Sequence, residues 1–301
     1  MEEAKLIARL LLIRHGETSA NVEGIIQGQS DYPLTEKGQA QASAISLALI
    51  NKNIRKIFTS DLSRAYETAL AIKSNHEEAE LYSDERLREI LLGSRENLPQ
   101  GTTRENADRI QASRQGIPSR KYQPPPFESS HDVVARVGEF LEEILIDCIK
   151  ENGNSSTEES KSDASLRTFS SSSDQRDGSL KARNRGSGEL DNVPCFAIIS
   201  HNGALYRMLT EVCGVRNLRK LENCSITTVE AYQSPVNLRT AQSALPGQQG
   251  SGGSAVQLYA SAGCSNHHLQ NVQFMYKPVK LNDTKHLRGS LAPVDVVLDY
   301  A

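Results

Sequence analysis

The order of apolar and helical segments predicts an α/β protein, a three-layer α/β/α sandwich with a mainly parallel central sheet. Short apolar runs alternate with longer segments of helical spacing, and this alternation is typical of strand–helix–strand units. The apolar runs do not alternate with polar residues, as expected for strands that are covered on both faces. Polar clusters follow directly where these runs stop, at the edge of the sheet where α/β proteins bind ligands.

The first half of the chain contains the clearest elements. Strands are predicted at residues 6–13, 54–59 and 81–82. Thr18 and Thr35 have side chains that can cap the helices that follow them. The helix after Thr35 is expected to bury a face made of Ala40, Ala44, Leu47 and Ala48.

Three further helices are predicted before residue 151. The helix after Arg64 is expected to bury Ala65, Thr68, Ala69 and Ile72. One helix falls near residues 104–114, inside an irregular and Pro-rich excursion. An amphipathic helix runs from 129 to about 150, with apolar residues at helical spacing from Val133 to Leu145.

Residues 151–192 differ in composition from the rest of the chain. They are rich in Ser, mixed in charge and almost without large apolar side chains, so burial cannot offset the entropy lost on ordering them. The hydrophobic fraction of the whole chain, 38%, is correspondingly low. We therefore predict one domain over residues 5–301, interrupted by a disordered insertion at 151–192.

The elements after the insertion are shorter. Strands are predicted at residues 195–200, 225–232 and 255–260, with a weaker strand at 273–276. A helix is expected from Ala204 to about Cys213, and Gly214 is suited to end it. No element is predicted in the tail from Lys277, because its apolar residues have no clear period.

Composition excludes several classes of protein. The net charge is −3, so neither nucleic acid nor a membrane surface is an expected partner. Five cysteines without a CxxC pair form neither a disulfide framework nor a zinc ribbon, and fit a reducing compartment. No apolar run approaches the roughly 20 residues of a spanning helix, and the acidic start is unlike a signal peptide. We expect a cytoplasmic protein, with access to the nucleus left open.

Three polar clusters stand at predicted strand ends: Arg14-His15, Ser60 to Arg64, and His201-Asn202. A parallel sheet brings such ends to one edge. The two arginines there have planar guanidinium groups, whose N–H donors match the spacing of the oxygens of a phosphate. One histidine can attack phosphorus while the other donates a hydrogen bond to a phosphate oxygen. Because the arginines supply positive charge, we expect no metal ion and no other cofactor.

Phosphoryl transfer also needs a group that gives and takes protons. Glu89, in Leu87-Arg88-Glu89, is the candidate. Glu85 and Glu96 are close to it in sequence, and an ordinary solvated side chain is the alternative for Glu89. Arg109, Arg114 and Arg120 are candidates for binding a second phosphate, with solvated side chains again the alternative.

Several motifs occur in order along the chain: Arg14-His15-Gly16-Glu17-Thr18, Asn21, Gln27-Gly28, Leu34 to Gly38, Ser60 to Ala65, Leu87-Arg88-Glu89, Glu128-Ser129 with Arg136, and Ser200-His201. This set resembles the histidine phosphatase superfamily, in its phosphoglycerate mutase-like branch. Within it, the chain looks most similar to the TIGAR-type fructose-2,6-bisphosphatases. That finer similarity rests on Ile25 to Gln29, the long insertion, and Leu281-Asn282-Asp283 with His286-Leu287.

The resemblance implies roles for individual residues. His15 is implied to be the nucleophile that carries the phosphoryl group, and Glu89 the proton donor and acceptor. Arg14, Arg64 and His201 are implied to hold the phosphate, and the residues implied to line the substrate site are Asn21, Gln27, Gly28 and Asn202. The sequence departs from the family's pattern at three places: Asn202, the pair Pro126-Phe127, and Asn97. The last two fall in the excursion of residues 97–127, so they bear on the substrate more than on the chemistry.

The implied function is that of a metal-independent phosphatase that works through phosphohistidine. Its expected partner is a small phosphorylated metabolite, a sugar or glycerate bisphosphate, with fructose 2,6-bisphosphate first. A phosphoglycerate mutase and a non-catalytic phosphoprotein-binding module are the alternatives. The oligomeric state is not predicted.

Overall fold

The computed structural model describes residues 4–158, 193–234 and 272–291. Most of the predicted insertion and the predicted strand at 255–260 lie outside the described residues. No helix in the described ranges is long and apolar enough to cross a membrane.

Six strands form one sheet in the described part of the chain, in the order β3-β2-β4-β1-β5-β6. Their bounds are Lys5–Arg14 (β1), Ile54–Thr59 (β2), Glu80–Ser83 (β3), Cys195–Ser200 (β4), Ile226–Gln233 (β5) and Phe274–Asp283 (β6). Strands β3, β2, β4 and β1 are parallel neighbours, β5 is antiparallel to β1, and β6 is antiparallel to β5. The predicted α/β class with a mainly parallel sheet is confirmed. Because β4 lies between β2 and β1, a strand from after residues 159–192 is inserted between two strands from before them.

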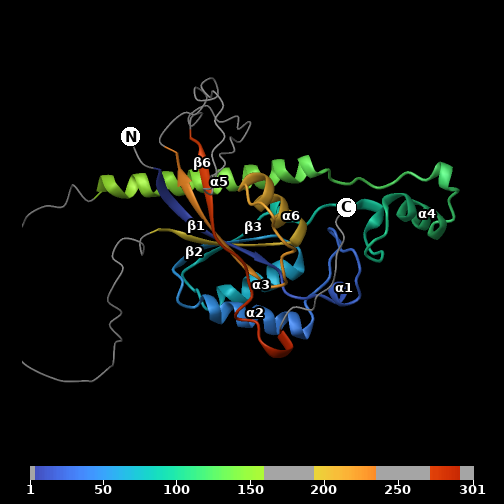
Figure 1. Cartoon of the computed structure of the whole chain (residues 1–301), viewed down its shortest axis with the longest axis horizontal. Coiled ribbons are helices and arrows are strands. Elements are labelled where there is room, and N and C mark those ends of the chain that lie inside the picture. Colours follow the sequence, from blue (N-terminus) through green and yellow to red (C-terminus); the bar gives the residue numbers. More distant parts are fainter. Residues whose placement is uncertain (1–3, 159–192, 235–271, 292–301) are drawn as a thin grey trace, which may run out of the picture.

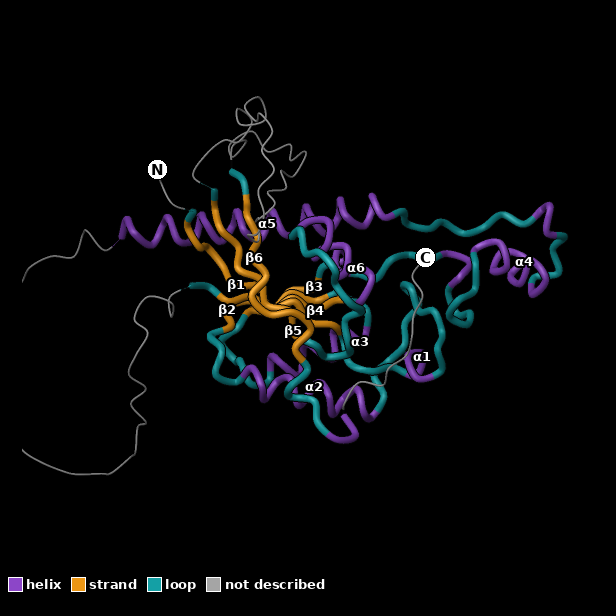
Figure 2. Tube along the Cα trace, viewed as in Figure 1, coloured by secondary structure: helices purple, strands orange, loops and turns teal. Residues whose placement is uncertain are grey.

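Helices cover both faces of this sheet and extend beyond one end of it. Helices α5 (Ser130–Glu158) and α6 (Asn202–Arg207) lie on one face, and α2 (Glu36–Leu49) and α3 (Ser63–Lys73) lie on the other (Figure 1). Helix α1 (Ser19–Val22) and helix α4 (Arg104–Arg114) belong to the loops past the sheet's end, which Figure 2 shows in teal and purple. Turns of 3-10 helix occupy Glu85–Leu87, Gly93–Arg95, Ser119–Lys121 and Gly289–Leu291, and a π-helical turn, Met208–Val212, continues α6.

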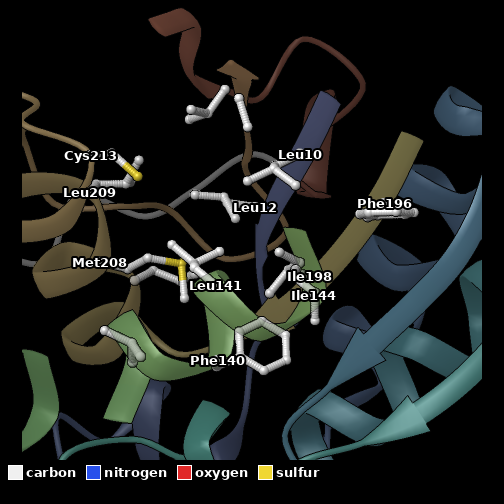
Figure 3. Packing of buried hydrophobic residues seen from close by; sticks show 14 of the residues in the cluster. Leu10, Leu12, Phe140, Leu141, Ile144, Phe196, Ile198, Met208, Leu209 and Cys213 are labelled. Carbon is white, nitrogen blue, oxygen red and sulfur yellow. The ribbon is translucent and has the colours of Figure 1, made fainter. Parts of the chain in front are cut away.

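The unbroken apolar run of β1 is explained by its central position. Leu10 and Leu12 face α5 and α6, in the buried cluster that also contains Phe140 (Figure 3). Leu11 and Ile13 face α2 and α3, in a second buried cluster. Because side chains alternate along a strand, a strand covered on both faces must be apolar at every position.

The buried faces of α3 and α5 agree with the prediction, and the buried face of α2 does not. Helices α3 and α5 bury the predicted residues, from Ala65 to Ile72 and from Val133 to Leu145. The predicted face of α2 is wrong at three of its four residues: Leu47 is 63% exposed, and Ala40 and Ala48 are exposed. Ala44 is half-buried against the core, and the helix buries Ala42, Ile45 and Leu49.

Hydrogen bonds explain why α2 buries the other face. Gln41 is buried because its Oε1 accepts from the Glu17 N–H at 2.9 Å and its Nε2 donates to the Leu291 carbonyl at 3.1 Å. Ser46 is buried with its hydroxyl donating to the Ala71 carbonyl of α3. Buried polar groups with partners carry little penalty, so hydrophobicity alone selected the wrong side of this Ala-rich helix.

Two elements extend beyond their predicted ends. Helix α5 continues past Lys150 to Glu158, eight residues into the segment predicted to be disordered. Glu151 pairs with Lys56 of β2 at 2.6 Å, which holds this part of the helix against the sheet. Strand β6 runs to Asp283, through a stretch for which no element was predicted, because it pairs along β5.

Candidate active site

The two predicted histidines meet at the carboxyl end of the sheet. Arg14 of β1 is opposite Ser200 of β4 in the parallel register, so His15 and His201, the next residues, leave neighbouring strands at the same level. The His15 N–H donates to the Ser200 carbonyl at 3.0 Å. The ring centroids of His15 and His201 are 5.1 Å apart.

His15 is held in one tautomer by the backbone. Its Nδ1 lies 2.7 Å from the Gly16 carbonyl oxygen, and a carbonyl can only accept, so Nδ1 carries the proton and Nε2 has the free lone pair. His15 is 2% exposed. Burial, reinforced by the charges of Arg64 and Arg14, lowers the pKa of His15 well below 6.5. A neutral imidazole with an available Nε2 is what nucleophilic attack requires.

Gly16 is required because the loop after β1 touches the first turn of α2. A Cβ on Gly16 would lie 2.6 Å from the Gly38 carbonyl oxygen, closer than side-chain carbons ever approach. The Gly16 N–H donates to the Thr68 hydroxyl of α3 at 3.1 Å. The loop that orients His15 is therefore fixed by both helices on that face. Thr18 and Thr35 cap α1 and α2 as predicted.

Arg64 fixes the second histidine. Its Nε–H donates to Nδ1 of His201 at 3.1 Å, so the proton of a neutral His201 is on Nε2. That Nε2 is buried and has no hydrogen-bond partner among the described residues. Burial, followed by the charge of Arg64, lowers the pKa of His201 well below 6.5. A buried donor without a partner is costly unless a ligand accepts from it, and a phosphate oxygen can do so.

The remaining bonds of Arg64 lead to a loop of residues 28–31. Its Nη2 donates to the Gly28 carbonyl at 2.8 Å and its Nη1 to the Ser30 carbonyl at 2.9 Å. Three of the five N–H groups of the guanidinium therefore hold protein atoms. Arg64 is 1% exposed, and burial lowers its pKa to about 10. Gly28, predicted to bind substrate, has φ +54° and contributes its carbonyl to Arg64.

Arg14 and Asn202 both bond to the backbone of one residue, Leu221. Nη1 of Arg14 donates to the Leu221 carbonyl at 2.6 Å. Oδ1 of Asn202 accepts from the Leu221 N–H at 3.1 Å. Asn202 was predicted to contact substrate, and the structure brings its side chain to Leu221, the residue whose carbonyl holds Arg14.

Glu89 lies at the start of α6, beside His201. Its Oε2 accepts from the Gly203 N–H at 3.0 Å, and its Oε1 accepts from the N–H groups of Ala204 at 3.1 Å and of Ile90 at 2.9 Å. A Cβ on Gly203 would lie 2.4 Å from Oε1 of Glu89. Glu89 is thus attached to the helix that follows His201, not to an ordinary solvated surface.

The backbone around Glu89 is held by residues to which sequence reasoning assigned no role. Arg136 donates to the carbonyls of Arg86, Arg88 and Glu89 at 2.6–3.2 Å, and it pairs with Glu128 at 2.7 Å. Gln29 donates to the Glu89 carbonyl at 3.1 Å. The eight-residue spacing of Glu128 and Arg136 was visible in the sequence, but their partners were not.

Asn21 and Gln27 share one partner. The Thr18 hydroxyl lies 3.0 Å from Oε1 of Gln27 and 3.1 Å from Oδ1 of Asn21. Oδ1 of Asn21 also accepts from the Thr18 N–H at 3.1 Å. Both side chains therefore lie together beside α1, next to the loop that carries His15.

Comparison with known proteins identifies the family. A model of the histidine phosphatase superfamily (branch 1) matches residues 10–152. The fructose-2,6-bisphosphatase TIGAR B of Danio rerio is 31% identical over 203 residues, 66% of this chain and 72% of that protein. A probable phosphoglycerate mutase, GpmB of Cronobacter sakazakii, is 30% identical over 234 residues, 75% of this chain and 86% of that protein. This chain belongs to the histidine phosphatase superfamily.

Other matches support the histidine phosphatase fold over different lengths. The fructose-2,6-bisphosphatase TIGAR of Xenopus tropicalis is 38% identical over 137 residues, 44% of this chain. The match spans about half of that relative, 48% of its length. The solved structure of mycobacterial hydrolase 2 has a TM-score of 0.53 at 20% identity, over 96% of this chain and 93% of that one. Bacillus anthracis phosphoglycerate mutase has a TM-score of 0.50 at 17% identity, over 75% of this chain and 88% of that one.

The arginines in the excursion of residues 97–127 are exposed, whereas Arg14 and Arg64 of the site are buried. Arg109, Arg114 and Arg120 are exposed, and Arg109 pairs with Glu105. A cavity of about 390 Å³ lies between the excursion and Ser30, and its lining contains no Lys, Arg or His. The three arginines were candidates for a second phosphate, and their exposure favours the solvated alternative.

Proposed function

We propose that this chain is a phosphatase that works through a phosphohistidine on small sugar or glycerate bisphosphates, with fructose 2,6-bisphosphate first. The observation that carries the proposal is the tautomer of His15, whose Nε2 lone pair is free beside the Arg64–His201 pair. The positive charge that the transferred group needs comes from Arg14 and Arg64, and no metal ion has a role in the proposal.

In the first step, Nε2 of His15 attacks phosphorus. The N–P bond forms as the bond from phosphorus to the leaving oxygen breaks, and Glu89 gives its proton to that oxygen. The Nε2–H of His201 and the guanidinium groups of Arg14 and Arg64 hold the transferred oxygens. Nδ1 of His15 keeps its proton and shares the developing positive charge with the Gly16 carbonyl.

In the second step, water replaces His15. The water oxygen bonds to phosphorus, the N–P electrons return to Nε2 of His15, and the proton of the water passes to Glu89. The products are the dephosphorylated alcohol and inorganic phosphate, and the enzyme is restored. Support for Glu89 in this role comes from its position at α6, one turn from His201.

The order of the strands supports one domain as the unit of this activity. Strand β4, from after residues 159–192, lies between β2 and β1, from before them, so neither half builds the site alone. We propose that residues 5–301 form one histidine phosphatase domain with an insertion at 151–192. Its cytoplasmic location stays a prediction, as does its independence of nucleic acid.

The substrate is proposed from the relatives' names. Three relatives at 31–38% identity carry the name fructose-2,6-bisphosphatase TIGAR. The test is release of phosphate by the purified chain from fructose 2,6-bisphosphate, bisphosphoglycerates, sugar monophosphates and phosphopeptides. We expect the highest kcat/KM with fructose 2,6-bisphosphate. Preference for a phosphopeptide contradicts the proposed substrate class.

A phosphoglycerate mutase is the second candidate, favoured by the GpmB relative. A mutase returns the phosphoryl group to the bound product instead of to water. Incubation with 3-phosphoglycerate and a bisphosphate primer separates the two activities. Isomerisation without free phosphate identifies a mutase and overturns our choice.

A non-catalytic phosphoprotein-binding module is tested by replacing His15. The proposal requires that His15→Ala loses turnover and acid-labile phosphorylation of the protein. His131→Ala, at an exposed position of α5, is the matched control and keeps both. Undiminished turnover in His15→Ala refutes the phosphohistidine mechanism.

A further inference from the structure

The segment Leu221–Cys224, just before β5, lies against the loop that carries His15. The Leu221 carbonyl accepts from Arg14. The Cys224 N–H lies 3.0 Å from the Arg14 carbonyl and 3.3 Å from the His15 carbonyl. This segment is more than 200 residues from His15 in sequence, and sequence reasoning assigned it no role.

Asn223 is the residue of this segment whose side chain is seen to bond to the loop that carries His15. Its Nδ2 lies 2.9 Å from the His15 carbonyl, 3.1 Å from the Gly16 carbonyl and 3.2 Å from Oδ1 of Asn21. All three partners accept hydrogen bonds, and the amide NH₂ can donate. The contacts therefore require the amide and cannot be made by a carboxylate.

The Gly16 carbonyl connects Asn223 to the nucleophile. This same oxygen accepts the Nδ1–H of His15 at 2.7 Å. Its direction sets both the tautomer of His15 and the angle at which Nε2 faces phosphorus. A glycine peptide rotates more easily than others, so a second donor is needed to hold the carbonyl in place.

We propose that Asn223 is a positioning residue, which holds the Gly16 carbonyl in the direction that orients His15 for attack on phosphorus. The inference rests on the proposed phosphohistidine mechanism and adds a residue to it. Asn223 touches no reacting atom. It acts through Gly16 on His15, and through Asn21 on the cap of α1.

The end of β6 fixes the segment that carries Asn223. Oδ1 of Asn282 accepts from the Glu222 N–H at 2.9 Å, and its Nδ2 donates to the Lys220 carbonyl at 3.2 Å. Nε2 of His286 lies 2.9 Å from the Cys224 carbonyl. These contacts give a physical role to the Leu281-Asn282-Asp283 and His286-Leu287 motifs, which resemblance alone had singled out.

The expected defect is in chemistry and not in binding. Without the amide, the Gly16 carbonyl loses one of its two donors and Nε2 of His15 spends less time in line with phosphorus. Second-layer partners that orient a reacting group typically contribute about 10–100-fold in rate. The arginines that hold the phosphate keep their own contacts, so KM is expected to stay within about twofold.

The experiment is single-turnover phosphorylation of the full chain by p-nitrophenyl phosphate, with acid-labile protein phosphate as the readout. The rate of phosphorylation is expected to fall about 10–100-fold in Asn223→Ala. Asn223→Asp has the same shape but turns a carboxylate oxygen toward three acceptors, so we expect a larger loss. If the side chain of Asn223 only filled space, Asn223→Asp would lose less of the phosphorylation rate than Asn223→Ala.

Two further variants complete the test. Asn75→Ala removes an amide that donates to Ser46 at 2.8 Å, away from the site, and is expected to keep the rate. Asn282→Gly keeps the left-handed backbone at φ +48° and removes the amide that holds residues 220–222. It is expected to slow phosphorylation without touching the site, and it serves if an Asn223 variant does not fold.

The outcomes separate this inference from the function on which it rests. If the unaltered chain forms no phosphohistidine, the proposed function fails and the inference fails with it. If the unaltered chain is phosphorylated and Asn223→Ala reacts at the same rate, only the inference is overturned. Equal losses in Asn223→Ala and Asn75→Ala, in step with their Tm values, also overturn it.

Discussion

Arg64 donates its Nε–H to Nδ1 of His201 over 3.1 Å, and this single contact determines which nitrogen of His201 carries the proton. The same guanidinium holds the Gly28 and Ser30 carbonyls. One side chain therefore orients the second histidine, fixes the neighbouring loop and supplies positive charge. A planar fork with five N–H groups can do all three, and an ammonium cannot.

Arg64→Lys is accordingly expected to be a severe substitution. Lysine keeps the charge but cannot reach His201 and both carbonyls at once. We expect kcat to fall about 10²–10³-fold, the usual effect of losing an oriented donor in the transition state. Steady-state hydrolysis of p-nitrophenyl phosphate measures this. Arg109→Lys, at an exposed position, is the control, and a similar kcat in both variants would contradict the role of Arg64.

Local patterns in the sequence were enough to predict the residues that gather at the sheet edge. An apolar run followed by Arg14-His15, and another followed by His201, needs only the parallel sheet to bring the histidines together. The amide of Asn223 could not be predicted in this way. Its partners are the carbonyls of His15 and Gly16, and no pattern in the surrounding residues reveals contacts across more than 200 positions.

The wrong face of α2 has a different physical origin. Alanine is common on both sides of that helix, so the hydrophobic pattern was weak. The buried side was selected by Gln41 and Ser46, which find hydrogen-bond partners on Glu17, Leu291 and α3. Sequence reasoning treats such residues as exposed because their partners become visible only in the folded chain.

Glu89 can be tested through the leaving group. If Glu89 protonates the leaving oxygen, Glu89→Gln loses more activity with an alkyl phosphate than with p-nitrophenyl phosphate, whose leaving group needs little protonation. We expect a difference of about 10²-fold between the two substrates. Glu85→Gln, at an exposed neighbouring carboxylate, should change neither. Equal losses on both substrates in Glu89→Gln would argue for a binding role instead.

Gly203→Ala should reproduce the Glu89 defect without altering the carboxyl group. The new Cβ would lie 2.4 Å from Oε1 of Glu89 and 2.8 Å from Cδ1 of Ile90, so Glu89 must move from the start of α6. We expect the same selective loss on alkyl phosphates, in the same assay. If the variant hydrolyses alkyl phosphates normally, the position of Glu89 at α6 does not matter for catalysis.

The two buried histidines make stability depend on pH. Burial, with Arg64, lowers the pKa of His15 and of His201 well below 6.5. Below about pH 6.5 the unfolded chain therefore binds protons that the folded chain does not. The free energy of unfolding therefore decreases as the pH is lowered below about 6.5, by up to ~1.4 kcal/mol per pH unit for each histidine. Above about pH 6.5 both histidines are neutral in the folded and the unfolded chain, so this loss of stability is absent.

Urea unfolding between pH 7.5 and 5.0 measures this dependence. His201→Gln removes one of the two titrating groups, so the slope of unfolding free energy against pH is expected to decrease. His131→Gln, at an exposed position, should leave the slope unchanged. If His201→Gln and His131→Gln have the same slope, His201 is not held neutral by burial.

Replacing glycine by alanine is expected to have opposite effects on the free energy of unfolding at two helical positions, Gly138 and Gly38. Replacing glycine by alanine inside a helix ordinarily stabilises a protein by about 1 kcal/mol. Gly138 of α5 is such a case, because a Cβ there would meet only Cγ2 of Val212 at 3.9 Å. Gly38 of α2 is the exception. Its Cβ would lie 2.1 Å from the Glu17 carbonyl oxygen and 2.9 Å from the Glu17 nitrogen.

Gly38→Ala must therefore push α2 away from the loop that carries His15, because backbone atoms cannot yield as a flexible side chain can. We expect Gly138→Ala to raise the free energy of unfolding by about 0.5–1 kcal/mol. We expect Gly38→Ala to lower it by about 1–3 kcal/mol and to slow phosphorylation of His15, since Gly16 and Glu17 move with the loop. Urea unfolding of both variants, with the single-turnover assay, measures these effects. A stabilised Gly38→Ala would mean that the loop after β1 does not rest on α2.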